Sequence, residues 1–413
     1  MTELVIEGGN VLTGEVEIGG AKNSVVALMP AAILGTRVVI KKVPQISDVD
    51  NLKTILQYLG VSIEEGNETF ILDMSNIENK PFSKEEASKL RASYYFMGAL
   101  LARFGECEIY HPGGCVIGQR PIDLHLNGFK ALGATITEED NKYLIKADKL
   151  VGNTIDLSFP SVGATINIMI AASKAEGTTT INNVALEPEI DNVIELLNSM
   201  GSKIKREETS IIIEGVSEMN EGSVKVIPDR IEAGTYVIAG ALAGNSLKIT
   251  NVIPKHFWPL VEVLQKIGAN IEVHDNYIIT SKAESLKPID VVAEPYPGFP
   301  TDLQQPLTAL LATADGVSHI TETIYENRFR NVEYLNQMGA DIEINGNQIT
   351  IKGPKKLQGG NVVSTDLRAG ACLVIAGLIC KGTTRISSIE HIIRGYEHLT
   401  EKLSKVNANI KIV

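Results

Sequence analysis

The sequence contains little cysteine: four residues in a chain of 413, with no Cys-X-X-Cys pair and no spacing typical of a disulfide framework. We therefore expect a reducing compartment. The seven histidines are scattered, and no group of histidines, cysteines and acidic residues has metal-ligand spacing. The sequence accordingly predicts no metal site.

Long hydrophobic runs and an excess of basic charge are also missing. The longest apolar run, residues 371–380, is too short to span a bilayer. The first residues include the acidic Glu3 and no apolar core, so we expect no signal peptide. A net charge of −12 argues against general binding to a phosphate backbone. We expect a cytoplasmic protein with no membrane insertion and no nucleic-acid partner, in which a local cluster of cations holds any bound anion.

A short pattern of a small residue, usually glycine, that ends an amphipathic stretch recurs six times along the chain. The copies are residues 59–63, 132–136, 200–204, 267–271, 338–342 and 406–410, at intervals of 67 to 73 residues. We predict that each glycine is the left-handed residue just past a helix, and Asn407, which replaces it in the last copy, is the next best residue there. Alternating segments follow, and residues 342–351 predict a hairpin with Asn-Gly at its tip.

A second set of six stretches, apolar or small nearly all round, predicts buried helices. They are residues 21–34, 90–104, 161–175, 229–243, 301–314 and 365–380. With the short β-rich runs that follow, one unit consists of helix, strand, helix and hairpin. Six units predict an α/β fold made of two inside-out α/β barrels, three units per domain. We expect one domain at residues 22–229, the other at 1–21 with 230–413, and the active site in the cleft between them.

The glycine-rich segment 111–123 places Cys115 five residues ahead of Arg120. Three glycines permit mobility there, whereas Pro121 stiffens what we predict to be a helix start. A thiol on such a segment can approach a bound anion and act as an acid or a nucleophile. The alternative is that Cys115 simply fills an apolar hole.

The starts of the predicted buried helices carry cations, and a helix start that opens into a cleft favours anions. Lys22, Arg91 and Arg368 are of this kind, and Arg394 also lies beside a small-residue stretch. Burying so many cations is costly unless they meet anions, and few carboxylates lie nearby in sequence, so we predict a small polyanionic ligand. Arg230 is the exception, because Asp229 or Glu232 can pair with it.

Acidic and hydroxyl residues at these starts allow two interpretations. Ser161, Thr301 and Asp366 are good helix caps, and capping alone can explain them. If Thr301 caps its helix, the neighbouring Asp302 is free to accept a proton from a substrate hydroxyl. Capping by Asp302 itself is the alternative.

Nine segments, taken together and in order, resemble the enolpyruvyl transferases over essentially the whole chain. They are residues 19–23, 90–93, 112–125, 161–165, 228–232, 299–302, 321–329, 365–368 and 394–397. Within the family, the resemblance is to the branch that transfers enolpyruvate from phosphoenolpyruvate to the 3-hydroxyl of UDP-N-acetylglucosamine. This reaction releases phosphate, commits the cell to peptidoglycan synthesis, and needs no metal or cofactor.

The resemblance also implies residue roles. Lys22 and Arg120 hold the phosphate of phosphoenolpyruvate, and three arginines clamp its carboxylate: Arg328, Arg368 and Arg394. Cys115 acts as an acid that can add covalently to phosphoenolpyruvate, and fosfomycin alkylates this thiol. The residues implied in binding the sugar nucleotide or lining the substrate site are Asn23, Arg91, Arg120, Pro121, Ile122, Asp123, Leu124, Ser161, Val162, Gly163, Asp302 and Ile324.

The chemistry fits this set of residues. Protonation of the enol ether creates an electron-poor carbon that the sugar hydroxyl attacks, which calls for an acid, a base and several cations. The set contains one of each: Cys115 can be the acid, Asp302 the base, and Lys22 and the arginines the cations. One departure is Phe159-Pro160, where some relatives have a lysine, so aromatic packing or another cation has to replace that contact.

Two other functions remain as alternatives. The first is 3-phosphoshikimate 1-carboxyvinyltransferase, a sister enzyme that lacks a loop like that of Cys115 and typically has Ser-Lys-Ser where this chain has Ala21-Lys22-Asn23. The second is a non-catalytic paralogue that binds a UDP-sugar. The simultaneous presence of Cys115, Asp302 and the cations argues against the second.

Overall fold

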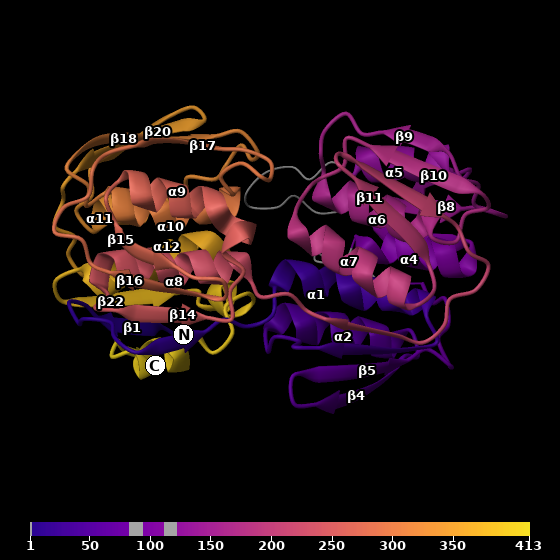
Figure 1. Ribbon diagram of the computed structural model, residues 1–413, viewed down its shortest axis with the longest axis horizontal. Helices are drawn as coiled ribbons and strands as arrows, with labels where there is room; N and C mark the ends of the chain where they lie inside the picture. The colour runs from indigo at the N-terminus through magenta and orange to yellow at the C-terminus, as the bar shows by residue number, and fades with distance from the viewer. Residues whose placement is uncertain (1, 82–93, 111–121) are drawn as a thin grey trace. The chain divides into compact units, whose positions relative to one another are not determined.

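Three buried helices stand at the centre of each of two units in the computed structural model, which describes residues 2–81, 94–110 and 122–413 (Figure 1). Unit 1 contains residues 2–19 and 228–413, and unit 2 contains the described residues from 20 to 227. The central helices of unit 2 are α1 (Lys22–Ala31, continued by η1, Ala32–Leu34), α4 (Tyr95–Phe104) and α6 (Val162–Ala172). Those of unit 1 are α8 (Arg230–Ala243), α10 (Thr301–Leu311) and α12 (Leu367–Ile379).

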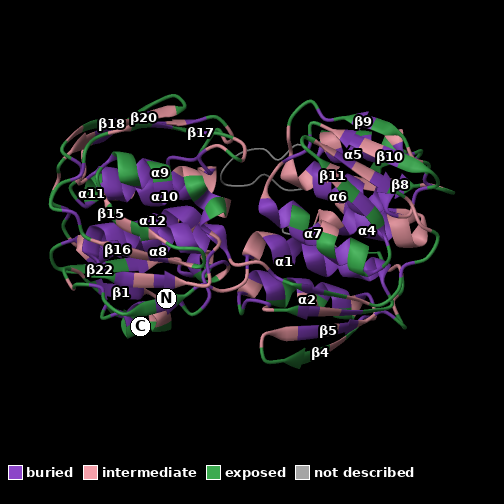
Figure 2. Cartoon of the chain, viewed as in Figure 1, coloured by how far each residue is buried: buried purple, intermediate pink, exposed green. Residues whose placement is uncertain are grey.

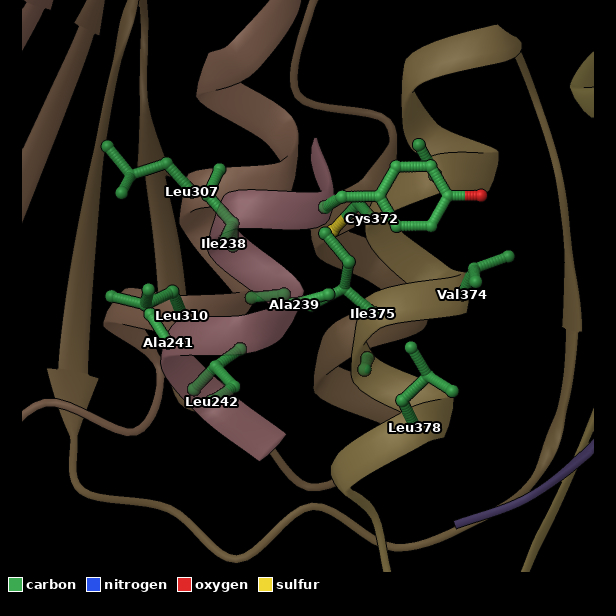
Figure 3. Packing of buried hydrophobic residues seen from close by; sticks show 14 of the residues in the cluster. Ile238, Ala239, Ala241, Leu242, Leu307, Leu310, Cys372, Val374, Ile375 and Leu378 are labelled. Carbon is green, nitrogen blue, oxygen red and sulfur yellow. The ribbon is translucent and has the colours of Figure 1, made fainter. Parts of the chain in front are cut away.

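These helices are central because they have no polar face. Every residue of α8 is buried, and in Figure 2 the central helices of unit 1 are purple nearly all round. Figure 3 shows Ile238 of α8, Leu307 of α10 and Ile375 of α12 among the side chains packed at this centre. Each fully buried side chain of this size contributes about 1.5–3 kcal/mol of hydrophobic free energy, so the three helices form the core of the unit.

Small mixed sheets surround the central helices. Five of the sheets in the described residues have four strands, and the sixth has three. In each four-stranded sheet one strand pairs in parallel with its neighbour, and the other pairings are antiparallel. The strands of unit 2 are β3 (Arg37–Lys41), β4 (Ser62–Gly66), β5 (Thr69–Asp73), β6 (Glu106–Tyr110), β7 (Thr135–Glu139), β8 (Lys142–Lys146), β9 (Thr154–Asp156), β10 (Thr178–Asn182), β11 (Lys203–Glu207), β12 (Ser210–Glu214) and β13 (Gly222–Lys225).

Unit 1 repeats this arrangement. Its strands are β1 (Leu4–Glu7), β2 (Glu15–Glu17), β14 (Leu247–Thr250), β15 (Asn270–Val273), β16 (Tyr277–Ser281), β17 (Asp290–Ala293), β18 (Gly316–Glu322), β19 (Ile342–Asn345), β20 (Gln348–Gly353), β21 (Asn361–Val363), β22 (Thr383–Ser387) and β23 (Asn409–Ile412). The predicted fold class is confirmed: helices form the inside of each unit and open sheets lie around them.

The second helix of each repeat packs outside the central three. These helices are α2 (Ser47–Tyr58), α5 (Asp123–Ala131), α7 (Pro188–Ser199), η3 and α9 (Pro254–Phe257 and Trp258–Lys266), α11 (Asn331–Gln337), and α13 and α14 (Glu390–Ile393 and Leu399–Lys405). The residue just past each has a positive φ, between 75° and 105°: Gly60, Gly133, Gly201, Gly268, Gly339 and Asn407. The predicted left-handed helix ends are therefore confirmed, including the asparagine in the sixth copy.

Two strands are exchanged between repeats. Strand β2 precedes α1 in the chain but pairs in parallel with β14, which follows α8. Strand β13 precedes α8 but pairs in parallel with β3, which follows α1. The chain therefore passes from one unit to the other between β2 and α1 and returns between β13 and α8.

The hairpin of the sixth repeat differs from its predicted form. Instead of two consecutive strands, it combines β23 near the end of the chain with β1 near its beginning, in antiparallel register from Leu4 opposite Ile412 to Glu7 opposite Asn409. Strand β1 also pairs with β22. The N-terminal strand thus supplies the missing second strand of the last repeat.

Candidate functional site

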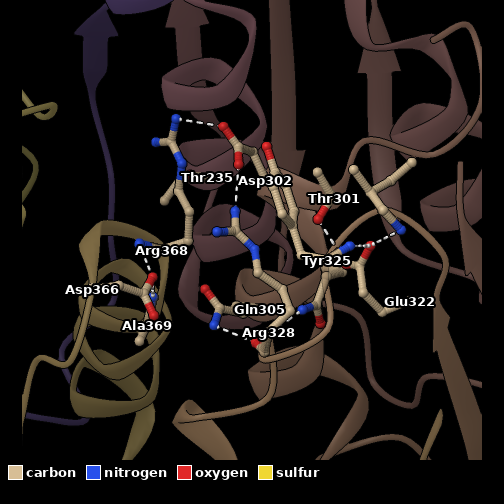
Figure 4. Close-up of polar contacts among 12 residues, drawn as sticks. Thr235, Thr301, Asp302, Gln305, Glu322, Tyr325, Arg328, Asp366, Arg368 and Ala369 are labelled. Carbon is tan, nitrogen blue, oxygen red and sulfur yellow. Dashed lines mark hydrogen bonds and ion pairs between the residues drawn. The ribbon is translucent and has the colours of Figure 1, made fainter. Parts of the chain in front are cut away.

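Asp302 is the centre of a polar cluster in unit 1 (Figure 4). It lies in the first turn of α10, and both of its carboxylate oxygens are in ion pairs. Arg368 donates from Nη2 to Oδ2 at 2.9 Å, and Arg328 donates from Nη2 to Oδ1. The arginine side chains are 4% and 5% exposed, whereas Asp302 is 26% exposed. The cluster is therefore nearly enclosed by protein but open on the side of the carboxylate.

This environment decides the charge of Asp302. Burial alone would raise the pKa of the carboxyl group, but Arg368 and Arg328, with a smaller contribution from Arg230, outweigh it and hold the pKa far below its ordinary value. Asp302 is consequently ionised throughout the physiological pH range. A carboxylate paired in this way is a weak base.

The expected cap of α10 by Thr301 is wrong. Pro300 occupies the cap position, and no side chain caps this helix. The Thr301 hydroxyl instead donates to Oε2 of Glu322 at 2.7 Å. Asp302 is nevertheless not a cap, since its oxygens are taken by the arginines.

Arg368 is positioned from three sides. Asp366 caps α12 by accepting hydrogen bonds from the backbone N–H groups of Arg368 and Ala369 at 2.9 and 3.0 Å, as predicted for this residue. The guanidinium also donates from Nη1 to the Tyr396 hydroxyl at 3.3 Å. Tyr396 in turn is 2.9 Å from the hydroxyl of Thr235 on α8. Helices α8 and α12 thus hold the arginine against Asp302.

Arg328 enters the cluster from the segment after β18. Its backbone carbonyl accepts hydrogen bonds from the side chains of Gln304 and Gln305 on α10, at 3.3 and 2.6 Å. Its guanidinium lies 5.3 Å from the centre of the Tyr325 ring, within the range of a cation–π contact. Both the backbone and the side chain of Arg328 are therefore tied to the helix that carries Asp302.

The pairing of Arg230 with Glu232 is also corrected. Glu232 accepts a hydrogen bond from Lys402 at 2.7 Å and one from the backbone N–H of Gly19 at 2.9 Å. The side chain of Asp229 caps α8. Arg230 is buried with its guanidinium 5.5 Å from the centre of the Tyr296 ring. Its charge therefore acts on Asp302 rather than neutralising Glu232.

Arg394 follows α13 and is half-buried. It lies two residues before Tyr396, whose hydroxyl contacts Arg368. Ile324 is half-buried and lies between Glu322 and Arg328 in the chain. Arg394, Ile324 and the Asp302 cluster are therefore all parts of unit 1.

In unit 2, Lys22 is the first residue of α1 and forms an ion pair with Asp48 of α2, with 3.1 Å between Nζ and Oδ2. Asp48 is 4% exposed. The argument that few carboxylates are available for the cations was therefore wrong for Lys22 and Arg368. It failed because it searched nearby in sequence, whereas tertiary packing brings the partner from another helix.

The starts of α5 and α6 come together around His125. Ser161 caps α6 by accepting from the backbone N–H of Ala164 at 3.3 Å, as predicted. A Cβ atom at Gly163 would stand 3.0 Å from Cε1 of His125, so the ring covers this helix start. Val162 and Asn23 are half-buried. Of the three residues that precede His125 in the chain, Ile122 is buried, Asp123 is exposed and Leu124 is half-buried.

The protonation of His125 follows from its neighbours. Asn167 accepts the backbone N–H of Gly98 on Oδ1 at 2.9 Å, so its amide nitrogen faces Nδ1 of His125, also at 2.9 Å. Nδ1 is thus an acceptor, and the neutral ring carries its proton on Nε2. Burial lowers the pKa of His125 to about 4, so the ring is neutral at physiological pH.

Four predicted site residues lie outside the described part of the chain: Arg91, Cys115, Arg120 and Pro121. The described cysteines, Cys107, Cys372 and Cys380, are buried. Burial raises the pKa of Cys107 and Cys372 to about 12 and also raises that of Cys380. The described thiols are accordingly inert by comparison with an ordinary cysteine.

Within residues 2–81, 94–110 and 122–413, we find no group of three or more histidine, cysteine and acidic residues arranged to hold a metal ion. No helix in this part of the chain is long and apolar enough to cross a membrane.

Comparisons with known proteins give a consistent result. The family model of EPSP synthase (3-phosphoshikimate 1-carboxyvinyltransferase) matches residues 6–403. The chain is 48% identical over 409 residues to UDP-N-acetylglucosamine 1-carboxyvinyltransferase 2 of Listeria monocytogenes, covering 98% of this chain and 97% of the relative. It is 49% identical over 413 residues to the protein of the same name from Bacillus subtilis, covering 99% and 96%.

Solved structures show the same fold. The enolpyruvyl transferase NikO from Streptomyces tendae superposes with a TM-score of 0.90 at 27% identity, covering 100% of this chain and 99% of that one. EPSP synthase from Acinetobacter baumannii superposes with a TM-score of 0.76 at 20% identity and covers both chains completely. At that identity the likeness to EPSP synthase concerns the fold alone.

Proposed function

The chain belongs to the EPSP synthase family, and on that premise we propose that it transfers the enolpyruvyl group of phosphoenolpyruvate to the 3-hydroxyl of UDP-N-acetylglucosamine, releasing phosphate. Two curated relatives named for this reaction match nearly the full chain at 48% and 49% identity. The structural observation that carries the proposal is the pair of buried guanidinium groups, from Arg328 and Arg368, that converge on Asp302. We place this reaction in the cytoplasm, as the first committed step of peptidoglycan synthesis.

The reaction needs a proton donor at one end and a proton acceptor at the other. A proton added to the methylene carbon of phosphoenolpyruvate leaves a positive charge on the neighbouring carbon, which the sugar hydroxyl attacks as it loses its own proton. The resulting intermediate then loses phosphate and a methyl proton to give the enol ether. Cys115 is the proposed acid and Asp302 the proposed base for the hydroxyl.

The cations hold the phosphate and the carboxylate of phosphoenolpyruvate in place while positive charge develops on the carbon between these two groups. We assign the phosphate to Lys22 and Arg120, and the carboxylate to Arg328, Arg368 and Arg394. Lys22 belongs to unit 2, whereas the last three arginines belong to unit 1. That both sets enclose one substrate stays a prediction.

Asp302 can act as a base only when its ion pairs with Arg328 and Arg368 weaken. While both arginines pair with it, the carboxylate accepts a proton poorly, because its pKa is far below the ordinary value. A substrate carboxylate that draws Arg328 and Arg368 toward itself weakens both pairs and raises the proton affinity of Asp302. Binding of phosphoenolpyruvate then prepares the base for the sugar hydroxyl.

Phosphate release tests the function. Purified protein with phosphoenolpyruvate is expected to release phosphate when UDP-N-acetylglucosamine is added, and not when shikimate 3-phosphate is added. Release with shikimate 3-phosphate alone would establish the sister reaction instead. No release with either acceptor, together with tight binding of UDP-N-acetylglucosamine, would favour a non-catalytic binding protein.

A further inference from the structure

Glu322, at the end of β18, is a buried carboxylate with every oxygen in use. It is 2% exposed. Oε1 accepts the backbone N–H groups of Ile324 and Tyr325 at 2.8 and 3.3 Å, and Oε2 accepts the hydroxyl of Thr301 at 2.7 Å (Figure 4). The side chain therefore joins two segments that are more than twenty residues apart.

The Glu322 backbone is fixed as well. Its N–H donates to the carbonyl of Asn347 at 2.8 Å, and its carbonyl accepts from the Asn347 side chain at 3.1 Å. The carboxylate thus extends from a strand end whose position is fixed, and it holds the Thr301 hydroxyl and the N–H groups of Ile324 and Tyr325 in place.

Glu322 has no cationic partner within 4 Å among the residues that the structure describes. Its charge is held only by a hydroxyl and two backbone N–H groups, although burying a carboxylate without a countercharge is costly. An apolar side chain would fill the same space without that cost, but it could bond to neither segment. The use of the Glu322 side chain is therefore the geometry that it enforces, since two polar atoms at its end are needed to reach both segments at once.

Both segments carry residues of the site. Thr301 precedes Asp302, the proposed base, and Ile324 is a proposed contact of the sugar nucleotide. A second link between the same segments is the ion pair of Arg328 with Asp302. Glu322 and Arg328 thus connect the segment after β18 to the first turn of α10 at two points, one on each side of Ile324 and Tyr325.

We propose that Glu322 is a positioning residue that fixes the Ile324 backbone relative to Asp302, and so sets the place of the acceptor sugar nucleotide in the site. This inference rests on the proposed function. Binding of phosphoenolpyruvate depends on Glu322 much less, because Arg328 and Arg368, two of its assigned contacts, are tied to α10 and to the cap of α12 through their own backbone groups, without Glu322.

The test uses four variants of the full chain. Glu322→Met keeps the length of the side chain and removes all acceptors. Glu322→Gln keeps an oxygen for the two N–H groups and turns an amide N–H toward the Thr301 hydroxyl, which can accept as well as donate. Thr301→Val removes one link only. Glu343→Met is the matched control, because it removes an exposed carboxylate, paired with Lys352, from the same sheet.

Steady-state kinetics with each substrate varied in turn give the readout. Glu322→Met is expected to raise KM for UDP-N-acetylglucosamine about tenfold or more while KM for phosphoenolpyruvate changes less than about twofold. Thr301→Val is expected to shift the same KM by about threefold, in the same direction. Glu322→Gln and Glu343→Met are expected to behave like the unchanged protein. Calorimetric titration of UDP-N-acetylglucosamine is expected to show the same order of affinities.

Other results would overturn the inference. Equal increases of both KM values in Glu322→Met, or a loss of kcat that follows the loss of folded protein, would mean that Glu322 supports the fold only. If Glu322→Met does not fold, unchanged kinetics in Thr301→Val would have the same meaning. A wild-type protein that is inactive with UDP-N-acetylglucosamine would end the proposed function and this inference together, whereas an active wild type with an unaffected Glu322→Met would end only the inference.

Discussion

Arg368 donates a hydrogen bond to Asp302 at 2.9 Å across 66 positions of sequence. The two residues lie in the first turns of different central helices of unit 1, α12 and α10. Each helix start favours negative charge, so a carboxylate is stabilised there, while a guanidinium at the same place needs a counterion. The ion pair meets both needs in the absence of substrate, and it marks the place where a substrate anion would compete with Asp302.

Asp302→Asn is expected to lower kcat by about a hundredfold or more, because an amide cannot take the proton of the sugar hydroxyl. Binding of UDP-N-acetylglucosamine is expected to change little, since the side chain keeps its shape. Kinetics together with calorimetric titration measure the two effects. A kcat close to that of the wild type would rule out Asp302 as the base.

The same substitution is expected to lower the free energy of unfolding by about 2 kcal/mol at pH 7, because Arg328 and Arg368 lose their counterion; the partial exposure of Asp302 keeps the loss below that of a fully buried pair. Because the folded pKa of Asp302 is lowered, its stabilisation is present above about pH 4 and is lost as the pH falls further. Urea unfolding measures this: the free energy of unfolding is expected to differ less between pH 7 and pH 3 in Asp302→Asn than in the wild type.

Cys115→Ser is expected to abolish turnover and covalent labelling by fosfomycin, whereas Cys372→Ser leaves both intact. Cys372 is buried with its pKa raised to about 12, so its thiolate is scarce at pH 7. Mass spectrometry of the intact protein after incubation with fosfomycin measures the labelling. Labelling of both variants to the same extent would show that another thiol reacts.

His125→Asn is expected to make the stability of unit 2 less dependent on pH. The asparagine oxygen can take the place of Nδ1 as the acceptor for Asn167, but it does not titrate. Because the folded pKa of His125 is lowered to about 4, the unfolded chain binds protons first, and the wild type loses about 2 kcal/mol between pH 7 and pH 5 through this residue. Urea unfolding at both pH values checks this, and an equal pH effect in both proteins would contradict it.

Phe159→Ala is expected to raise KM for UDP-N-acetylglucosamine by about three- to tenfold, if its ring replaces the lysine of some relatives by stacking on the base. The ring is 44% exposed and lies two residues before Ser161. Val151→Ala, at a similarly exposed apolar side chain of the same unit, is the control. Equal KM values for both variants would remove Phe159 from the site.

The central helices and the left-handed helix ends could be predicted because their signals are local. A helix without a polar face has to be buried, and a glycine or asparagine after an amphipathic stretch favours a positive φ. Both signals recur six times, so one ambiguous copy is corrected by the others. Capping by Asp366 and Ser161, one of two interpretations of these residues, is a local signal of the same kind, since a cap acts within three residues; Thr301 carried the same signal but does not cap α10.

Long-range partners could not be predicted in this way. Lys22 forms an ion pair with Asp48 on the next helix, and Glu322 accepts a hydrogen bond from Thr301. Neither contact has a signature in sequence spacing. The exchange of β2 and β13 was also missed, because strands of three or four residues show too little alternation to reveal their partners. Glu322 lies in a segment that carried the family resemblance, and its burial is what distinguishes it from the other acidic residue there, the exposed Glu326.

The pairing of β1 with β22 and β23 has a consequence for synthesis. Strand β1 has to wait for partners that are made much later in the same chain, which at about 5–20 residues per second takes roughly 20–80 s. The described residues of unit 2, in contrast, all lie between residues 20 and 227 and can fold once residue 227 has emerged. During translation, the edge of β1 therefore stays without its sheet partners until β22 and β23 have been made, while unit 2 can already be folded.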